Sequence, residues 1–219
     1  MGSQIVITRA DGGKTDGYLA PSGPGRPGIV VIQEWWGLND QICGVADRFA
    51  RAGYNAVAPD LYKGKVTSEP DEASHLMDGL NFPDATHQDL NGAVKFLREK
   101  SNKVAVMGFC MGGALTIAAA VHVPDIDAAV CFYGIPPQDF ADPAKIRVPL
   151  QGHFANKDDW CTPAKVTELD GTLKRAGVTH EIFHYDAAHA FFNERSSAYD
   201  VAASNLAWER MAEFLKKCM

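Results

Sequence analysis

Short, wholly apolar runs that alternate with helical patterns are the feature that most restricts the fold of this chain. Residues 29–32 (IVVI) and 104–107 (VAVM) contain no polar side chain, which is typical of strands buried on both faces of a sheet. Helical segments follow them, beginning near Asp40 and at Met111. Because parallel strands are joined by crossover helices, this alternation predicts an α/β fold with a mostly parallel central sheet and helices on both faces.

The other segments continue this pattern along the chain. Two strands around Asp11-Gly12-Gly13 predict an N-terminal antiparallel hairpin. No internal repeat or linker divides the series, so we expect one domain over residues 1–219. Strands are predicted at 4–8, 14–20, 29–32, 54–58, 103–108, 128–133, 148–154 and 179–185. Helices are predicted at 40–52, 69–79, 85–100, 111–121, 163–176 and 197–217.

The composition and charge of the chain indicate which kinds of binding partner to expect. A net charge of −6 argues against a nucleic-acid or anionic-membrane surface, and 46% hydrophobic with 22% charged residues suits a globular chain. No apolar stretch reaches the length of a membrane span, and the start lacks a signal-peptide pattern. The five cysteines form no C-x-x-C pair, which favours free thiols in a reducing compartment. We expect a cytoplasmic protein, a monomer or weak homodimer, that acts on a small molecule.

The segment GFCMGG, residues 108–113, has the pattern of a nucleophile turn between a strand and a helix. Gly108 and Gly112 allow close backbone packing while Cys110 is held in a strained conformation with its side chain exposed. The turn places the thiol at a helix N-terminus, where the N–H of Met111 can donate to an oxyanion. Cys110 is therefore predicted to be a nucleophile.

A thiol nucleophile needs a base and a residue that orients the base. In folds of this type the order along the chain is nucleophile, acid, histidine. His189 follows the last predicted strand, and Asp158 and Asp159 follow the strand before it. His189 is predicted to be the base, and either aspartate fits as the acid.

A carboxylate and two tryptophans follow the first apolar strand. Glu34 is predicted to be either a paired structural charge or a group that serves the site. The same loop is where a second oxyanion donor originates, and the backbone N–H of Trp35 is the best placed. We expect Trp36 and Arg195 to contact the substrate.

Six motifs occur in a specific order along the chain: QEWWGLND at 33–40, APDLY at 58–62, GFCMGGAL at 108–115, FYG at 132–134, HFANKDD at 153–159 and AHAFFN at 188–193. Taken together, they resemble the dienelactone hydrolase family of the α/β-hydrolase fold. The resemblance implies a triad of Cys110, Asp158 and His189, with Glu34 contacting the thiol in the resting enzyme and holding it away from the histidine. It implies hydrolysis of a small ester or lactone through a thioester, without metal or cofactor.

The sequence departs from this family in its arginines. The resemblance implies two arginines that hold a substrate carboxylate, one after PDLY and one four residues beyond the histidine. No arginine lies between Arg51 and Arg98, and position 193 is Asn. Lys63, Lys65 and Arg195 are the cations that could substitute.

Three alternative interpretations come from other motifs. Cys110 could serve a redox-sensing or binding protein without hydrolysis. HEIFH at 180–184 matches a zinc-hydrolase motif, but on a strand its two histidines stand about 13 Å apart, too far to share an ion. The glycines of SGPGRPG precede a strand, whereas a dinucleotide-binding loop follows one, so this segment is interpreted as a plain loop.

Overall fold

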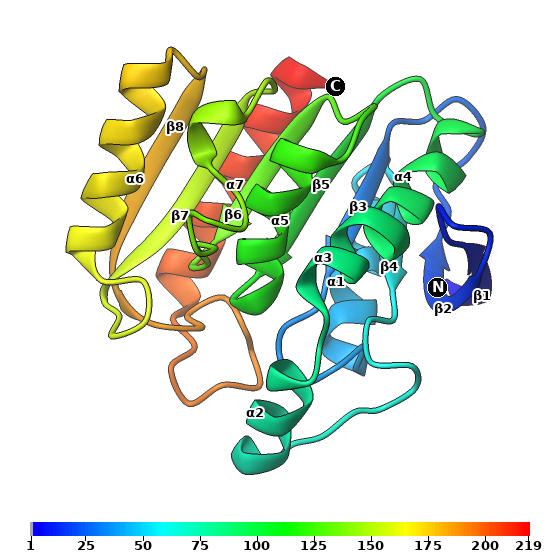
Figure 1. The fold of residues 1–219 in the computed structure, drawn as a ribbon, viewed down its shortest axis with the longest axis horizontal. Helices are drawn as coiled ribbons and strands as arrows, with labels where there is room; N and C mark the ends of the chain where they lie inside the picture. Colours follow the sequence, from blue (N-terminus) through cyan, green and yellow to red (C-terminus); the bar gives the residue numbers. More distant parts are fainter. Residues whose placement is uncertain (1) are drawn as a thin grey trace.

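The computed structural model describes residues 2–219 and contains one eight-stranded sheet, shown in Figure 1. The strand order is β1-β2-β4-β3-β5-β6-β7-β8; β1 and β2 pair antiparallel, β2 is antiparallel to β4, and the other pairs are parallel. The predicted hairpin and mostly parallel sheet are confirmed. The strands are β1 (Ser3–Thr8), β2 (Lys14–Ala20), β3 (Gly28–Ile32), β4 (Asn55–Pro59), β5 (Val104–Phe109), β6 (Ala128–Phe132), β7 (Leu150–Lys157) and β8 (His180–Ala188).

Helices cover both faces of the sheet (Figure 1). Helices α4, α5 and α6 pack into one apolar cluster, and α1 and α7 pack into a second on the opposite face. The helices are α1 (Asp40–Arg51), α2 (Pro70–Asp78), α3 (Phe82–Asp84), the π-helix η1 (Ala85–Leu90), α4 (Asn91–Arg98), α5 (Met111–His122), the 3₁₀-helix η2 (Pro143–Lys145), α6 (Pro163–Ala176) and α7 (Val201–Cys218).

The apolar strands are buried on both faces, as their sequences predict. Along β3, Val30 and Ile32 contribute to the cluster under α4 and α5, whereas Ile29 and Val31 contribute to the cluster under α1 and α7. All five residues of β3 and all six of β5 are buried. Alternate side chains along a strand point to opposite faces, so a strand with helices on both sides has no position for a polar residue.

One helix differs from the prediction at 85–100. Helical structure begins at Phe82, because the Asn81 side chain accepts a hydrogen bond from the Asp84 N–H and Pro83 suits the first turn. The run then widens into the π-helix η1 before continuing as α4. The helical periodicity used for prediction does not reveal such a wider turn.

Two strands run beyond their predicted ends. Strand β7 reaches Lys157 and β8 reaches Ala188, and these two residues are paired in the sheet. The C-terminal helix α7 begins at Val201, later than predicted, because the Asp200 side chain caps it by accepting from the Ala203 N–H. The longer strands carry the residues that follow them toward the same edge of the sheet.

Among residues 2–219, none of the helices combines the length and the apolar character needed to cross a membrane.

Candidate active site

The carboxyl ends of five neighbouring strands bring the predicted site residues together. Cys110 follows β5 and Tyr133 follows β6, and the Cys110 N–H donates to the carbonyl of Phe132 at 3.0 Å. Glu34 stands two residues beyond β3, while Asp158 and His189 directly follow the paired residues of β7 and β8. Ligand and active sites of parallel sheets form at this edge because the connecting loops leave it open.

The turn at Cys110 has the strained backbone predicted for a nucleophile. Its φ of 54° and ψ of −117° lie in a region that residues other than glycine rarely adopt. Helix α5 begins at the next residue, so the thiol stands at its N-terminus. The strain is maintained because β5 and α5 are both packed in the core and the turn between them has no freedom to relax.

Close packing around the turn explains its glycines. A Cβ atom on Gly108 would overlap the carbonyl oxygen of Gly112, and one on Gly112 would overlap the carbonyl oxygen of Gln33. Both atoms belong to backbone that cannot rotate away. The helix can therefore begin against the end of β3 only without side chains at these two positions.

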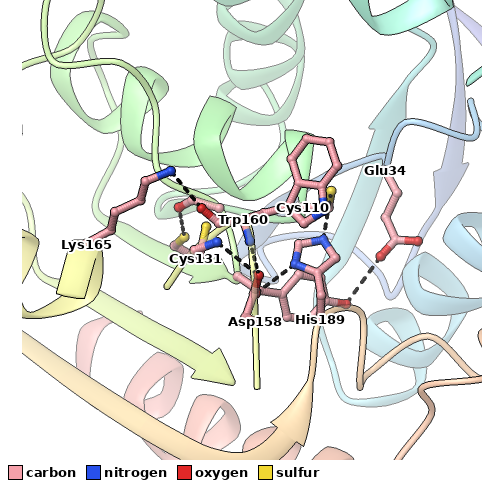
Figure 2. Close-up of polar contacts among 10 residues, drawn as sticks. Glu34, Cys110, Cys131, Asp158, Trp160, Lys165 and His189 are labelled. Carbon is pink, nitrogen blue, oxygen red and sulfur yellow. Dashed lines mark hydrogen bonds and ion pairs between the residues drawn. The ribbon is translucent and has the colours of Figure 1, made fainter. Parts of the chain in front are cut away.

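Cys110, His189 and Asp158 form a continuous hydrogen-bonded chain (Figure 2). The Cys110 Sγ lies 3.1 Å from Nε2 of His189, and Nδ1 of the same ring lies 2.7 Å from Oδ2 of Asp158. With the Nδ1 proton on the side of the carboxylate, Nε2 is left to accept the thiol proton. This geometry suits a nucleophile, a base and an orienting acid.

The structure places Asp158, not Asp159, against the histidine. Asp158 is buried, and its other oxygen, Oδ1, accepts the N–H groups of Trp160 at 2.8 Å and Cys161 at 2.9 Å. Burial acts to raise the pKa of Asp158, but the hydrogen bonds from His189 and from the two backbone N–H groups outweigh it and hold that pKa below its usual value. Asp159 is exposed and stands outside this network.

Glu34 is buried beside the triad with neutral partners. Its Oε1 accepts the hydroxyl of Tyr133 at 3.2 Å, and its Oε2 accepts the side-chain amide of Asn193 at 2.5 Å. Only 2% of the Glu34 surface is exposed. Burial raises its pKa to about 7, although the hydrogen bonds from Asn193 and Tyr133 and the nearby His189 act to lower it.

The resting contact expected between Glu34 and the thiol is absent from the hydrogen bonds formed by residues 2–219. The thiol contacts His189 instead, and both oxygens of Glu34 are taken by Tyr133 and Asn193. The negative charge of Glu34 still acts electrostatically on the Cys110 thiol. Burial raises the pKa of the Cys110 thiol most, the charge of Glu34 raises it further, and the Met111 N–H acts in the opposite direction.

Two residues around Glu34 were not predicted as site residues. Tyr133 packs edge-on against His189, with ring centroids 5.0 Å apart. The FYG motif, at the end of an apolar strand on the same sheet edge, is the signal that could have identified it. Asn193 was noted only as a missing arginine; its contact with Glu34 joins residues far apart in sequence and depends on the fold.

Three tryptophans line the loops around the triad. Trp35 contacts Trp36 and Trp160, with ring centroids 5.0 and 6.3 Å apart, and Trp160 lies 6.5 Å from the ring of His189. Trp160 is 61% exposed, which is unusual for so large an apolar side chain. Trp160 is not among the predicted site residues, although it follows the two candidate acids directly.

The backbone around Trp35 is a turn. The Gly37 N–H donates to the carbonyl of Glu34 at 3.4 Å, and the Thr67 N–H donates to the carbonyl of Trp36 at 3.1 Å. Neither bond uses the N–H of Trp35. The roles of the Trp35 and Met111 N–H groups as oxyanion donors stay predictions, as does contact of Trp36 with substrate.

The cations suggested as carboxylate ligands lie at the surface. The Arg195 guanidinium is 55% exposed and stands 3.6 Å from Asp40. Lys63 and Lys65 are also exposed. A role for any of them in substrate binding stays a prediction.

The HEIFH segment lies on strand β8, as predicted. His180 contacts Asp170 on α6, with Nε2 3.0 Å from Oδ1. In the described part of the chain, residues 2–219, no group of three or more His, Cys, Asp or Glu side chains is arranged to hold a metal ion.

The sheet order, the strained turn after β5 and the Cys-His-Asp chain define an enzyme of the α/β-hydrolase class. The model of the "Dienelactone hydrolase family" matches residues 15–219. Relatives include "Protein usf" of Aquifex pyrophilus, 37% identical over 98% of each chain. Another is a "Putative carboxymethylenebutenolidase" of Aquifex aeolicus, 32% identical over 97% of each chain.

Solved structures agree with these relatives. A crystal structure described as a "Putative Dienelactone Hydrolase" from Klebsiella pneumoniae superposes with a TM-score of 0.86, at 25% identity over 96% of each chain. The chain belongs to the dienelactone hydrolase family, and it is a carboxylic ester hydrolase.

Proposed function

We propose that the chain hydrolyses small carboxylic esters or lactones through a thioester formed on Cys110, without a cofactor. The observation that carries the proposal is the uninterrupted chain from the Cys110 thiol through His189 to Asp158. The base is within reach of the nucleophile, and an ionised acid orients the base.

In the first half of the reaction, Nε2 of His189 takes the Cys110 proton as the sulfur attacks the carbonyl carbon of the ester. The negative charge moves to the carbonyl oxygen, where the N–H groups of Trp35 and Met111 are proposed to donate. The carbon–oxygen bond of the leaving alcohol then breaks, and His189 returns the proton to that oxygen. A thioester on Cys110 remains.

In the second half, water attacks the thioester while His189 takes one of its protons. The carbon–sulfur bond breaks, His189 returns the proton to sulfur, and the acid product leaves. Asp158 holds the tautomer of the ring and stabilises the imidazolium in both halves. The thiol is uncharged at rest because burial and Glu34 raise its pKa, so proton transfer accompanies attack rather than preceding it.

The redox-sensing alternative has less support. Reaction with peroxide requires a thiolate at rest, which a lowered pKa provides. At Cys110 the pKa is raised, first by burial and then by Glu34. The pairing of His189 with an acid is the arrangement that hydrolysis requires, because the base must also return its proton to the leaving group.

We further propose that the protein is cytoplasmic and acts as a monomer or weak homodimer, with a small-molecule substrate rather than a nucleic acid or membrane. All five cysteines are free thiols, which suits a reducing compartment.

The test is the hydrolysis of a short p-nitrophenyl ester by two cysteine variants. Cys110→Ala is expected to lower kcat/KM by about 10³-fold or more, because the covalent intermediate cannot form. Cys43→Ala is the matched control and should keep the wild-type rate, since Cys43 lies on α1 and takes no part in the hydrogen bonds of the triad. Mass spectrometry after rapid quenching should find the acyl group on Cys110; wild-type turnover by Cys110→Ala would refute the mechanism.

A further inference from the structure

The hydrogen-bonding environment of Glu34 is the starting observation. Both carboxylate oxygens accept hydrogen bonds, and both donors, Tyr133 and Asn193, are uncharged. The ion pairs formed within residues 2–219 do not include Glu34. The charge of this buried carboxylate is therefore neutralised by no Lys or Arg side chain.

Glu34 also stands close to the reacting atoms. Tyr133 bridges the two, because its hydroxyl donates to Glu34 while its ring packs against His189. Burial is the largest cause of the raised pKa of the Cys110 thiol, and the negative charge of Glu34 raises that pKa further. A field that opposes a negative charge on sulfur also opposes a negative charge on a substrate that occupies the neighbouring space.

The other groups around Glu34 do not reverse this effect. His189 is paired with Asp158, and Glu194, on the segment that carries Asn193, adds a second negative charge nearby. Cys110 and Tyr133 are uncharged in their ordinary state. The surroundings of the nucleophile are thus negative whenever Glu34 is ionised.

We propose that Glu34, fixed by Asn193 and Tyr133, is a specificity-determining residue that makes the Cys110 site accept uncharged substrates and reject those with a carboxylate near the reacting carbon. The choice of esters as substrates rests on the proposed function above, whereas rejection of anions is a property of the site itself. It can be measured at the thiol without any hydrolysis.

The first experiment compares alkylation of Cys110 by iodoacetamide, which is neutral, and by iodoacetate, which is anionic. Both reagents react with the thiolate, so the intrinsic reactivity of the sulfur cancels when the two rates are divided. Peptide mass spectrometry follows Cys110 alone, and the same cysteine in the urea-unfolded chain supplies the intrinsic ratio. At pH 8 the folded wild type should favour iodoacetamide over that reference by on the order of 10-fold or more.

Two variants locate the source of this preference. Glu34→Gln removes the buried charge. In this variant the ratio of the iodoacetamide rate to the iodoacetate rate should therefore lie within about threefold of the ratio in the unfolded chain. Glu194→Gln removes a neighbouring charge whose side chain is exposed, and it should keep most of the wild-type preference. If folded wild type shows the same rate ratio as the unfolded chain, the proposal is overturned without any variant. A preference for iodoacetamide that survives in folded Glu34→Gln also overturns it.

The pH dependence provides a separate check. Burial raises the pKa of Glu34 to about 7, so the preference for iodoacetamide should grow from pH 6 to pH 8 as Glu34 ionises. Glu34→Gln lacks this ionisation, so its preference should change little over the same pH range. An equal pH dependence in wild type and Glu34→Gln would contradict the assignment to Glu34.

Turnover then extends the result to substrates. The p-nitrophenyl ester of monomethyl succinate should give a kcat/KM at least about tenfold above that of p-nitrophenyl hemisuccinate at pH 8, and Glu34→Gln should narrow the difference. If neither ester is hydrolysed but the alkylation preference holds, the proposed function fails and the inference about anions stands. If the two reagents alkylate Cys110 with no preference beyond that of the unfolded chain but the esters are hydrolysed, the proposed function stands and the inference about anions fails.

Discussion

At the scale of single residues, the environment separates three acidic side chains that the sequence places near the site. Asp158 is buried, but its hydrogen bonds from His189, Trp160 and Cys161 hold its pKa low and keep it ionised. Glu34 is buried with two neutral donors, and its pKa rises to about 7. Asp159 is exposed. Side chains of similar chemistry thus have different charge states because their partners differ.

Substitution of the two neighbouring aspartates should have unequal effects. Asp158→Asn is expected to lower kcat by about 10²- to 10⁴-fold, because the amide neither stabilises an imidazolium nor holds the required tautomer. Asp159→Asn should keep the rate within about twofold. The measurement is steady-state hydrolysis of one p-nitrophenyl ester, with circular dichroism to confirm folding; equal mild losses would remove Asp158 from the mechanism.

At the scale of secondary-structure elements, the decisive unit is β5, the turn and α5. A buried strand and a helix with many small residues approach each other closely, and neither Gly108 nor Gly112, on either side of Cys110, has room for a side chain. The positive φ of Cys110 follows from this approach. The strain in the nucleophile is thus a consequence of how two packed elements meet.

Two glycine substitutions should change stability in opposite directions. Gly112→Ala is expected to lower the free energy of unfolding by about 1–3 kcal/mol or more, because its Cβ overlaps the carbonyl of Gln33. Gly44→Ala, on the exposed face of α1 with no atom within 4 Å of the new Cβ, should raise it by about 0.5–1 kcal/mol. Urea unfolding monitored by tryptophan fluorescence measures both; a neutral Gly112→Ala would contradict the packing argument.

At the scale of the whole molecule, a polar network around the buried His153 connects strands β7 and β8 to helix α7. His153 on β7 lies 2.7 Å from the Tyr185 hydroxyl on β8 and 2.9 Å from Oε1 of Gln151. The Gln151 amide in turn donates to Glu181 at 2.8 Å and to the carbonyl of Arg210 on α7 at 3.3 Å. Burial lowers the pKa of His153 to about 3, so the network contains a neutral imidazole.

This histidine should make global stability depend on pH. The unfolded state binds a proton at His153 near pH 6.5, whereas the folded state binds one only near pH 3. The free energy of unfolding should therefore fall by about 1.4 kcal/mol per pH unit below pH 6.5 from this residue. Above pH 6.5 its contribution is constant.

Urea unfolding at pH 7 and pH 5 tests this dependence. His153→Asn should remove the slope due to His153, while His87→Asn, at an exposed histidine, should keep it. The comparison between variants cancels the contribution of Glu34, whose raised pKa acts in the opposite direction. Equal slopes in wild type and His153→Asn would show that the buried imidazole is not the titrating group.

Much of the architecture could be predicted from local patterns. The apolar runs at β3 and β5, the Gly-x-Cys-x-Gly turn and the order Cys110, aspartate, His189 follow from residue types and spacing. Parallel strands open their carboxyl ends to one edge, so these residues could be expected together. The predictions were less accurate at element ends, where a cap such as Asn81 or Asp200 decides the boundary.

The sequence by itself determined a mostly parallel sheet, a nucleophile turn and the chemical types available at its edge, because periodicity and glycine placement are local properties. Only the tertiary structure decided that Asp158 rather than Asp159 contacts His189, and that Glu34 contacts Asn193 and Tyr133 instead of the thiol. Those outcomes depend on which strand ends are adjacent and how deeply each carboxylate is buried. The burial of a carboxylate and the charges around it depend on residues from many parts of the folded chain, so they do not follow from spacing along the sequence.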